Sequence, residues 1–257
     1  MYQEVLSLYA REKGLSLREA TQTFMQVIVL RHLSDPHARF MGGTALVLGY
    51  GNPRFSEDVD FTQVSDPANL KGGLVKTRIE LEGWFQSPVA LVSPKAGART
   101  WRLTARLGRA ESIRLHVDSQ SCKAHTSRPV VINYPSIPSF ICEAIEVNEI
   151  MAEKIIAVAF RRYLGGRDLF DLWFHWLQAD DWASRKAMIL DLVDRKIRER
   201  SLRRTELAQV LKSRLSEKLV LQRAHEEWKR YLPPDFQRPS VLHDVVERCR
   251  RLTELFP

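Results

Sequence analysis

Apolar residues recur at helical spacing in the first part of the chain and predict two helices there. Within residues 2–33 the pattern breaks near Gly14, which separates the two helices. Ser16 and Glu19 form the Ser-x-x-Glu pattern of a capping box, so the second helix is expected to begin directly after Ser16. The helical pattern is expected to end at Pro36, because the residue before a proline is disfavoured in a helix.

The middle of the chain alternates between short β-prone runs and turn-forming residues. The runs predict strands at residues 39–41, 59–63, 89–92, 101–107 and 113–118. A helix is expected over residues 69–84, interrupted at Gly72 and Gly73. Together these elements predict a mixed sheet with helices packed on it.

After Pro135 and Pro138 the apolar spacing becomes helical and is expected to remain so. It predicts helices at residues 145–163, 167–178, 181–200, 205–231 and 240–255. The fold class that follows is α+β, with a small mixed β-sheet head, flanking helices and then a helical C-terminal bundle. The expected domains are residues 1–135, which include the N-terminal helices, and residues 136–257.

Composition and charge narrow the classes of partner without changing the expected fold. The 257 residues are 44% hydrophobic and 27% charged, as in ordinary globular proteins. The net charge of +8 is compatible with nucleotides, nucleic acids and an anionic membrane surface as partners, and alone it is weak evidence for any of them. No run reaches the roughly 20 apolar residues of a membrane span, so a cytoplasmic protein without a membrane partner is expected. Cys122, Cys142 and Cys249 lie far apart, which argues against a disulfide framework or a structural zinc site.

The first candidate for ligand binding is a glycine turn. A predicted strand ends at Met41 and runs into Gly42 and Gly43, and a helical segment follows with Thr44 near its start. Glycine lets the backbone approach a ligand closely, Thr44 can cap the helix, and the free N–H groups at a helix start favour phosphate oxygens. Turns of this kind are common, so the turn alone is weak evidence for binding.

Two aspartates strengthen the interpretation as a binding site. Alternate residues of a strand face the same side, so Asp58 and Asp60 point together while Val59 and Phe61 enter the core. Neighbouring carboxylates repel each other unless a cation lies between them, and oxygen-rich sites suit Mg²⁺ or Mn²⁺ with nucleotide phosphates. An isolated Asp-x-Asp would be interpreted as a solvated strand end, but the preceding glycine turn favours a metal site.

A second charged cluster lies at the start of a predicted helix in the C-terminal part. Asp168 and Asp171 are one helical turn apart and therefore share a helix face. Arg167 stands at the first turn, where a cation opposes the helix dipole, so a carboxylate or phosphate is expected nearby. Gly165 and Gly166 are expected to make the start of this helix flexible.

The order of these motifs resembles the AbiEii/AbiGii toxin branch of the DNA polymerase β-like nucleotidyltransferase superfamily. The resemblance rests on Gly-Gly-Thr-Ala-Leu at residues 42–46 and on Arg-Phe-Ser-Glu-Asp-Val-Asp-Phe at residues 54–61. It continues in Ala-Glu-Lys at residues 152–154 and in Arg-Asp-Leu-Phe-Asp-Leu at residues 167–172. The gap before the first aspartate is slightly longer than in the general superfamily pattern but suits this branch.

The resemblance implies an NTP-dependent nucleotidyltransferase that needs Mg²⁺ or Mn²⁺ and releases pyrophosphate. It implies that Asp58 and Asp60 hold the metal and that the nucleotide is bound by a further group of residues: Gly42, Gly43, Thr44, Ser56 and Arg167. The general superfamily pattern includes a third carboxylate on a later strand, for which Asp118 is the candidate. An equally weighted alternative is that Asp118 caps the turn that follows it.

The resemblance also implies roles for the helical motifs. Lys154 is taken to contact the nucleotide phosphates, and Asp168 to complete the active site, with Asp171 as the competing choice. From the residue pattern alone, Lys154 could equally be a lysine that extends along the edge of the core. His116, His175, Trp173 and Trp176 are expected to be packing residues.

The biological role and the acceptor follow from the same resemblance. It implies the toxin of a toxin–antitoxin or phage-defence pair, with a cognate antitoxin protein and an RNA acceptor, in particular tRNA. The basic residues of the stretch 185–229 form either a solvated helix surface with local ion pairs or a docking surface for RNA phosphates. Two alternatives stay open: transfer of a nucleotide or phosphate to a protein hydroxyl, and a non-catalytic basic nucleic-acid-binding module.

Overall fold

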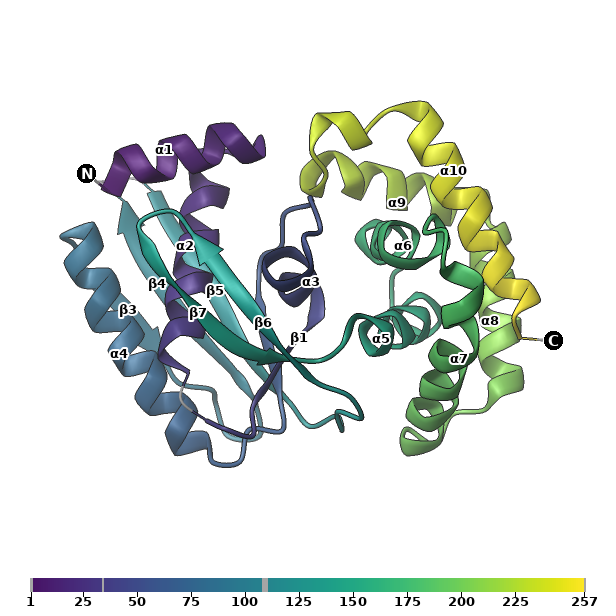
Figure 1. The fold of residues 1–257 in the computed structure, drawn as a ribbon, viewed down its shortest axis with the longest axis horizontal. Helices are drawn as coiled ribbons and strands as arrows, with labels where there is room; N and C mark the ends of the chain where they lie inside the picture. Colours follow the sequence, from purple (N-terminus) through teal and green to yellow (C-terminus); the bar gives the residue numbers. More distant parts are fainter. Residues whose placement is uncertain (1, 34, 108–110, 257) are drawn as a thin grey trace. The chain divides into compact units, whose positions relative to one another are not determined.

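The computed structural model describes residues 2–33, 35–107 and 111–256. The chain folds into two compact units, Met1–Ile145 and Glu146–Pro257 (Figure 1). The first unit holds the sheet and the second is helical, which confirms the α+β fold class. None of the described helices is long and apolar enough to cross a membrane.

The first unit is built on a seven-stranded mixed sheet with the strand order β3-β4-β5-β2-β1-β7-β6. Strand β2 runs parallel to β5 and β1 runs parallel to β7, while the other neighbours are antiparallel. The strands are β1 (Arg39–Met41), β2 (Val59–Thr62), β3 (Val89–Val92), β4 (Thr100–Leu107), β5 (Glu111–Gln120), β6 (Arg128–Tyr134) and β7 (Ile137–Ala144).

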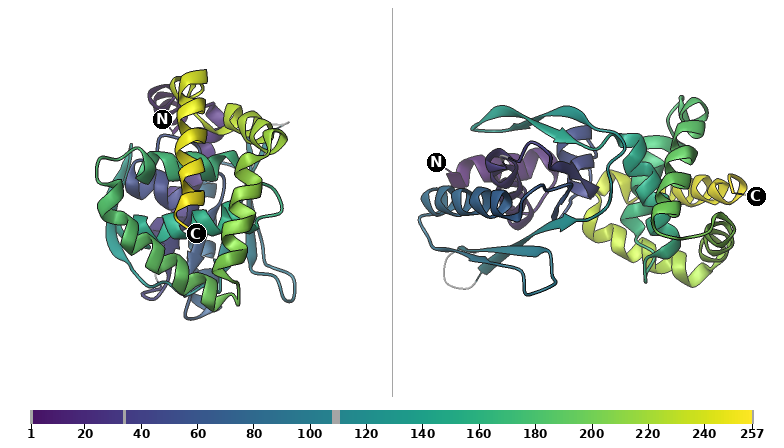
Figure 2. Two further views of the ribbon diagram at one scale, coloured as in Figure 1. Left: turned by 90° about the vertical axis from the view of Figure 1, so that its right-hand side faces the viewer. Right: turned by 90° about the horizontal axis from the view of Figure 1, so that it is seen from below.

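Helices α2 and α4 pack side by side against one face of the strands β3 to β5 (Figures 1 and 2). The apolar residues of β5, Ile113, Leu115 and Val117, are fully buried on that face, as strand alternation requires. Helix α2 begins as expected, because Ser16 and Glu19 exchange both hydrogen bonds of a capping box. The helices of this unit are α1 (Tyr2–Lys13), α2 (Leu17–His32), α3 (Gly42–Tyr50) and α4 (Pro67–Phe85).

Two expectations for this unit are wrong. Helix α4 is continuous through Gly72 and Gly73. A Cβ atom added at Gly73 would lie 2.8 Å from the carbonyl oxygen of His32, so this glycine permits close packing of α4 on the end of α2. The chain also does not become helical after Pro135, because residues 128–144 form the β6–β7 hairpin.

The hairpin explains why its prolines were misleading. Pro135 lies in the turn, where a fixed φ is favourable. Pro138 lies in β7, but β7 pairs with β1 only through Phe40 and Ala144, so the missing N–H of Pro138 interrupts no ladder on that side. No strand was predicted at Arg128–Tyr134, although its residues alternate in burial as in a strand with one exposed face. The helices therefore begin at Val147, later than expected.

The second unit is a bundle around a core of large apolar side chains, among them Phe170, Trp176 and Trp228. The expected helix at residues 205–231 is two helices that meet at Glu217. The elements are α5 (Val147–Phe160), α6 (Gly166–Leu172), the π-helix η1 (Trp173–Leu177), α7 (Trp182–Glu199), α8 (Arg204–Ser216), α9 (Lys218–Tyr231), the 3₁₀ helix η2 (Pro234–Phe236), α10 (Pro239–Arg250) and the 3₁₀ helix η3 (Arg251–Glu254).

The glycine at the start of α6 has a packing role in place of the expected flexibility. A Cβ atom added at Gly166 would lie 2.6 Å from the indole nitrogen of Trp228 and closer still to the carbonyl oxygen of Ala224. Both neighbours belong to α9, so α6 and α9 can approach this closely only when residue 166 has no side chain. The glycine thus fixes the helix that carries Asp168.

Candidate active site

Three aspartates lie along one face of the parallel strands β2 and β5. Asp58 directly precedes β2 and Asp60 is its second residue, while Val59 and Phe61 are fully buried on the opposite face, as predicted. The β2–β5 register places Asp60 beside Asp118. Since paired residues of neighbouring strands face the same side, the register directs both carboxylates to the same face of the sheet.

Neighbouring side chains of β5 contact the first two aspartates. Nδ1 of His116 lies 3.4 Å from Oδ1 of Asp58. The side-chain amide of Gln120 donates a hydrogen bond of 3.1 Å to Oδ1 of Asp60. The expectation that His116 is a packing residue is therefore wrong, because His116 lies on the solvent-exposed face of β5 beside the carboxylates. The sequence signal for His116 and Gln120 was strand alternation, because each lies two residues from Asp118 and therefore on the same face of β5.

The glycine turn is shaped around the side chains of the site itself. Gly42 has a φ of +77°, and a Cβ atom there would collide with the carboxylate of Asp60. A Cβ atom at Gly43 would collide with the guanidinium of Arg54 and lie 3.0 Å from Oγ of Ser56. The two glycines therefore allow the loop before β2 to lie directly against the start of α3.

Thr44 holds this loop and does not cap the helix. The N-cap of α3 is Met41, and Thr44 is buried inside the first turn. Its hydroxyl lies within hydrogen-bonding distance of the backbone oxygen of Asp58 and 2.8 Å from Oγ of Ser56. The expected capping role of Thr44 is thus replaced by a bond network that fixes the residues before β2.

Two glutamines of α2 support the same loop from the other side. The side-chain amide of Gln22 donates to the backbone oxygen of Glu57 at 2.7 Å, and that of Gln26 donates to the backbone oxygen of Ser56 at 2.8 Å. Two buried glutamines four residues apart in an apolar helix were the sequence signal for these contacts, and sequence analysis missed them. Arg54, only 2% exposed, donates to the backbone oxygen of Phe55 at 2.8 Å.

These aspartates fit a divalent cation by their chemistry and strand register. Carboxylate oxygens are the ligands that Mg²⁺ and Mn²⁺ prefer, and the register aligns Asp60 and Asp118 on one face. In the part of the chain that the structure describes, no group of three His, Cys, Asp or Glu side chains is already arranged to hold a metal ion. The structure therefore places the candidate donors on neighbouring strands without assembling them into a metal site.

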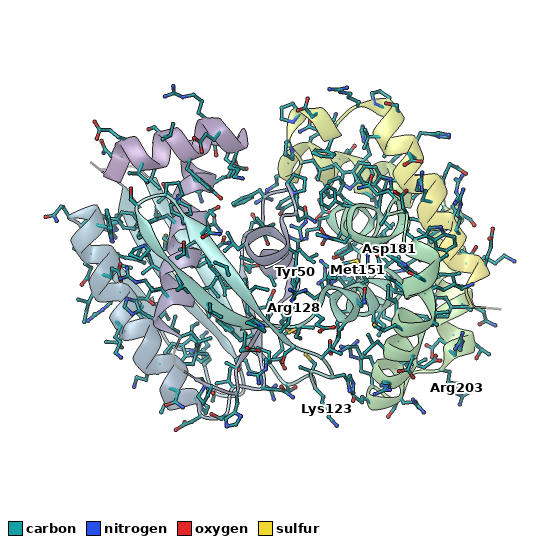
Figure 3. All side chains as sticks on the ribbon, in the orientation of Figure 1. Tyr50, Lys123, Arg128, Met151, Asp181 and Arg203 are labelled. Atoms are coloured by element: carbon teal, nitrogen blue, oxygen red, sulfur yellow. The ribbon has the colours of Figure 1, made fainter. Side chains whose placement is uncertain are left out.

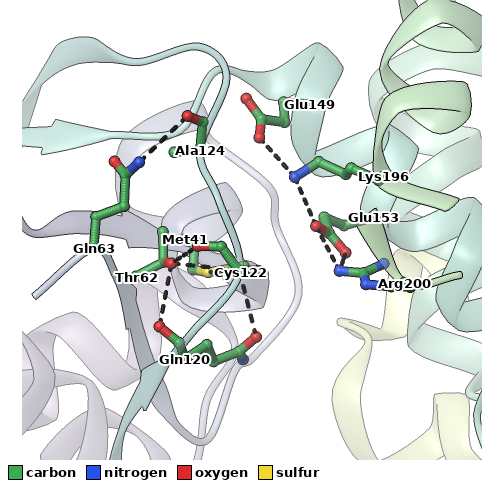
Figure 4. A network of polar contacts seen from close by, with 10 residues as sticks. All are labelled: Met41, Thr62, Gln63, Gln120, Cys122, Ala124, Glu149, Glu153, Lys196 and Arg200. Carbon is green, nitrogen blue, oxygen red and sulfur yellow. Dashed lines mark hydrogen bonds and ion pairs between the residues drawn. The ribbon is translucent and has the colours of Figure 1, made fainter. Parts of the chain in front are cut away.

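A cavity of about 560 Å³ lies at the ends of β2 and β5, on the side of the sheet that α4 covers, where Pro67, Leu70 and Trp101 line it. Gln120 lines it and also bonds Asp60, so the cavity and the carboxylates share a residue. The hydroxyl of Thr62 holds the backbone at Gln120 and Cys122 and so shapes the cavity wall (Figure 4). Its volume lies in the range typical of small-ligand sites, but none of Asp58, Asp60 and Asp118 lines it.

In the second unit, the two aspartates of α6 bind one lysine. Nζ of Lys154 lies 2.7 Å from Oδ1 of Asp168 and 2.7 Å from Oδ2 of Asp171. All three side chains are buried, and Arg161 adds an ion pair of 2.6 Å to Asp168. The predicted shared face of Asp168 and Asp171 is confirmed by their common partner. Lys154 does not extend along the edge of the core but lies in a buried ion-pair network.

The Ala-Glu-Lys motif of α5 connects two neighbouring helices. Lys154 forms ion pairs with α6. Glu153 forms ion pairs with Lys196 and Arg200 near the end of α7, at 2.8 and 2.7 Å (Figure 4). Glu149, one turn earlier, lies 2.7 Å from the same lysine. Burial by itself would lower the pKa of the Lys196 ammonium, but the charge of Glu153 and the hydrogen bonds to both glutamates raise it.

The cation at the start of α6 has the acidic neighbour that was expected. Nε of Arg167 lies 3.6 Å from Oε1 of Glu227, and its guanidinium lies 5.1 Å from the ring centre of Tyr231. Glu227 also accepts a hydrogen bond from the backbone N–H of Gly166. A carboxylate therefore offsets the unfavourable position of Arg167 at the helix start.

The predicted site residues thus form two clusters, each inside one unit. The first cluster contains Gly42, Gly43, Thr44, Ser56, Asp58, Asp60 and Asp118. The second contains Lys154, Arg167, Asp168 and Asp171. Cys122, Cys142 and Cys249, all in the described part of the chain, form no disulfide with one another.

Comparisons with known proteins identify the family and the fold. Residues 24–248 match the family model described as "Nucleotidyl transferase AbiEii toxin, Type IV TA system". The chain is similar in structure to MenT4, a nucleotidyltransferase toxin from Mycobacterium tuberculosis H37Rv, with a TM-score of 0.56 and 17% identity over 98% of this chain and 89% of MenT4. It is also similar to JHP933 from Helicobacter pylori, with a TM-score of 0.52 and 17% identity over 94% of this chain and 93% of JHP933. No curated protein matches the sequence significantly.

Proposed function

This chain belongs to the AbiEii nucleotidyltransferase toxin family of type IV toxin–antitoxin systems, and from that premise we propose that it transfers nucleotides from an NTP to the 3′ end of a tRNA. The observation that carries the proposal is the alignment of Asp58, Asp60 and Asp118 on one face of the sheet beside the glycine turn. In this proposal the reaction takes place in the cytoplasm. A cognate antitoxin protein inhibits it, and its biological role is phage defence.

Asp58 and Asp60 hold Mg²⁺ or Mn²⁺ in this proposal, with Asp118 as the third ligand. When bound, the ion supplies positive charge against the triphosphate. The backbone N–H groups at Gly42 and Gly43 and the hydroxyl of Ser56 meet the phosphate oxygens. The loop held by Thr44 and the α2 glutamines keeps these donors in place before substrate binds, which lowers the cost of organising them.

The reaction itself is a displacement at the α-phosphorus of the NTP. The terminal hydroxyl of the acceptor attacks, its new P–O bond forms, and the bond to pyrophosphate breaks. The hydroxyl proton leaves to a carboxylate of the aspartate cluster or to water. Positioning and charge stabilisation provide most of the acceleration in such transfers, which suits a site made of a rigid turn and acidic side chains.

For the helical unit we propose that Lys154 neutralises charge on the leaving pyrophosphate and that Arg167 contacts the nucleotide. This assignment rests on the family resemblance. Its support from the structure is that Asp168 and Asp171 fix the ammonium of Lys154, so its position on α5 is well defined. In this proposal Asp168 is the residue that completes the active site through Lys154, and Asp171 assists it.

A labelling assay tests the proposed function directly. Purified protein is incubated with Mg²⁺, total RNA and each of the four labelled NTPs in turn. We expect label on tRNA-sized RNA with at least one NTP. Label on protein alone would assign a protein hydroxyl as the acceptor, and no label from a folded protein would favour a non-catalytic nucleic-acid-binding module.

The role of Lys154 calls for a comparison of two lysines. Replacing either Lys154 or Lys196 by methionine removes a buried ammonium that binds two carboxylates, so both variants should lose stability. At a temperature where both remain folded, Lys154→Met should lower the rate of transfer at least about 100-fold, because it removes charge stabilisation at the phosphates. Lys196→Met should retain activity in proportion to its folded fraction. Equal activities of the two variants would remove Lys154 from the active site.

A further inference from the structure

Three arginines project from the solvent-exposed face of strands β4 and β5. Arg102 and Arg106 belong to β4 and Arg114 belongs to β5, and all three are exposed. In the antiparallel register Arg102 lies opposite His116 and Arg114 lies opposite Thr104. Strand alternation therefore places the three guanidinium groups on one face, which we call the arginine row.

The arginine row occupies the same face as the aspartates. His116, opposite Arg102, contacts Asp58, and two residues further along β5 lies Asp118. From Ser112, the partner of Arg106, to Asp118 is six residues of strand, or about 20 Å. The row therefore begins beside the aspartates and extends well beyond the length of a triphosphate.

The three side chains of the arginine row have no acidic partner among the described residues. Over the described ranges, no carboxylate lies within ion-pair distance of Arg102, Arg106 or Arg114. In the basic stretch 185–229, by contrast, many cations are neutralised within the chain. The pairs there are Arg195–Asp191 at 2.8 Å, Lys196–Glu149 and Lys196–Glu153 at 2.7 and 2.8 Å, Arg200–Glu153 at 2.7 Å and Arg204–Asp194 at 2.6 Å.

We propose that the arginine row binds backbone phosphates of the acceptor RNA and directs its 3′ end to Asp118 and Asp60. The inference rests on the proposed function, since it assumes an RNA acceptor. Exposed guanidinium groups without acidic partners present the forked donors that match phosphate oxygens, and no ion pair must be broken on binding. Phosphate contacts fix the position of a nucleic acid without reading its sequence, so the row aligns the acceptor but does not select it.

The test compares two triple variants that each remove three exposed arginines. One is R102Q/R106Q/R114Q in the arginine row. The matched control is R195Q/R198Q/R203Q in the helical unit, where Arg203 projects from the surface (Figure 3). Binding of fluorescently labelled bulk tRNA is measured by anisotropy at several salt concentrations, and transfer is measured with RNA and with NTP as the varied substrate.

We expect the row variant to bind tRNA at least about 10-fold more weakly, with a salt slope reduced by about 2, since each lost phosphate contact removes about 0.7. Its KM for RNA should rise, while its KM for NTP and its kcat stay near those of the wild type. A further variant with three lysines at the same positions keeps the charge and should bind at intermediate strength, which separates charge from fold.

The outcomes distinguish the inference from the function on which it rests. Unchanged tRNA binding in the row variant, or a loss only in the control variant, would overturn the arginine row as the docking surface. A wild-type protein that binds tRNA through the row but labels no RNA would support the row and contradict the proposed transfer. Wild-type protein that binds no tRNA, or labels protein alone, would overturn the inference.

Discussion

Replacing Asp58 by asparagine is expected to lower the rate of nucleotidyl transfer by about 1000-fold or more while leaving the melting temperature nearly unchanged. The substitution keeps the size of the side chain but removes the charge that would hold the divalent cation. Because the Asp58 side chain is 40% exposed, removing its charge leaves no buried charge behind. Transfer is measured with labelled NTP and RNA, and unfolding by circular dichroism.

Asp66 offers a matched control for this substitution. It is an exposed aspartate of the same unit whose carboxylate caps α4 by accepting from the N–H of Ala68 at 2.8 Å. Asparagine caps helices about as well as aspartate, so Asp66→Asn makes the same chemical change without disturbing the fold. Its transfer rate should match that of the wild type. Wild-type transfer by Asp58→Asn, or an equal loss in Asp66→Asn, would remove Asp58 from the proposed metal site.

The parts of this site that could be predicted from the sequence depend on local spacing. Strand alternation alone places Asp58 and Asp60 on one face and Val59 on the other. The capping box that starts α2 is likewise defined within four residues. The family resemblance brought Asp118 into the candidate list, and the β2–β5 register then placed it beside Asp60.

What could not be predicted depends on contacts between distant parts of the chain. Gly73 and Gly166 look like helix breakers in the sequence, yet each is required by the backbone of another helix that packs against it. Gln22 and Gln26 look like ordinary polar helix residues until the loop before β2 is folded onto α2. Pro138 would exclude a strand only if its missing N–H were needed to pair with a neighbouring strand. Which neighbours a strand has is set by the tertiary fold and cannot be read from the local sequence.

The buried ion pairs of the helical unit also depend on contacts between distant parts of the chain, and their effect on stability can be tested. Lys196→Met is expected to lower the free energy of unfolding of this unit by roughly 3–5 kcal/mol. Lys196 is only 1% exposed, and its ammonium lies between Glu149 and Glu153, so its removal leaves the fully buried Glu149 without this cation. Urea denaturation followed by tryptophan fluorescence measures the loss, because four of the six tryptophans belong to this unit.

Two further variants determine whether the loss comes from the uncompensated charge. Adding Glu149→Met to Lys196→Met should recover most of the stability, since apolar groups of similar size often replace a buried ion pair without penalty. Arg195→Gln breaks the exposed pair with Asp191 and should cost less than about 1 kcal/mol. A double variant no more stable than Lys196→Met would show that packing, and not charge, makes Lys196 necessary.

The pH dependence of the free energy of unfolding gives an independent check on the ion pair between Lys196 and Glu153. Burial alone would raise the pKa of Glu153, but Lys196 and Arg200 lower it below its usual value. Its contribution to stability is therefore present above the unfolded pKa of about 4.3 and is lost as pH falls through the lower folded pKa. The raised pKa of Lys196 makes its contribution present below the unfolded value of about 10.4 and lost as pH rises through the folded one. The stability difference between wild type and Lys196→Met should consequently be flat from about pH 6 to 9 and narrow below about pH 4, where protonation of Glu153 removes a charge that Lys196 balances. A difference that stays constant down to pH 3 would contradict an electrostatic origin.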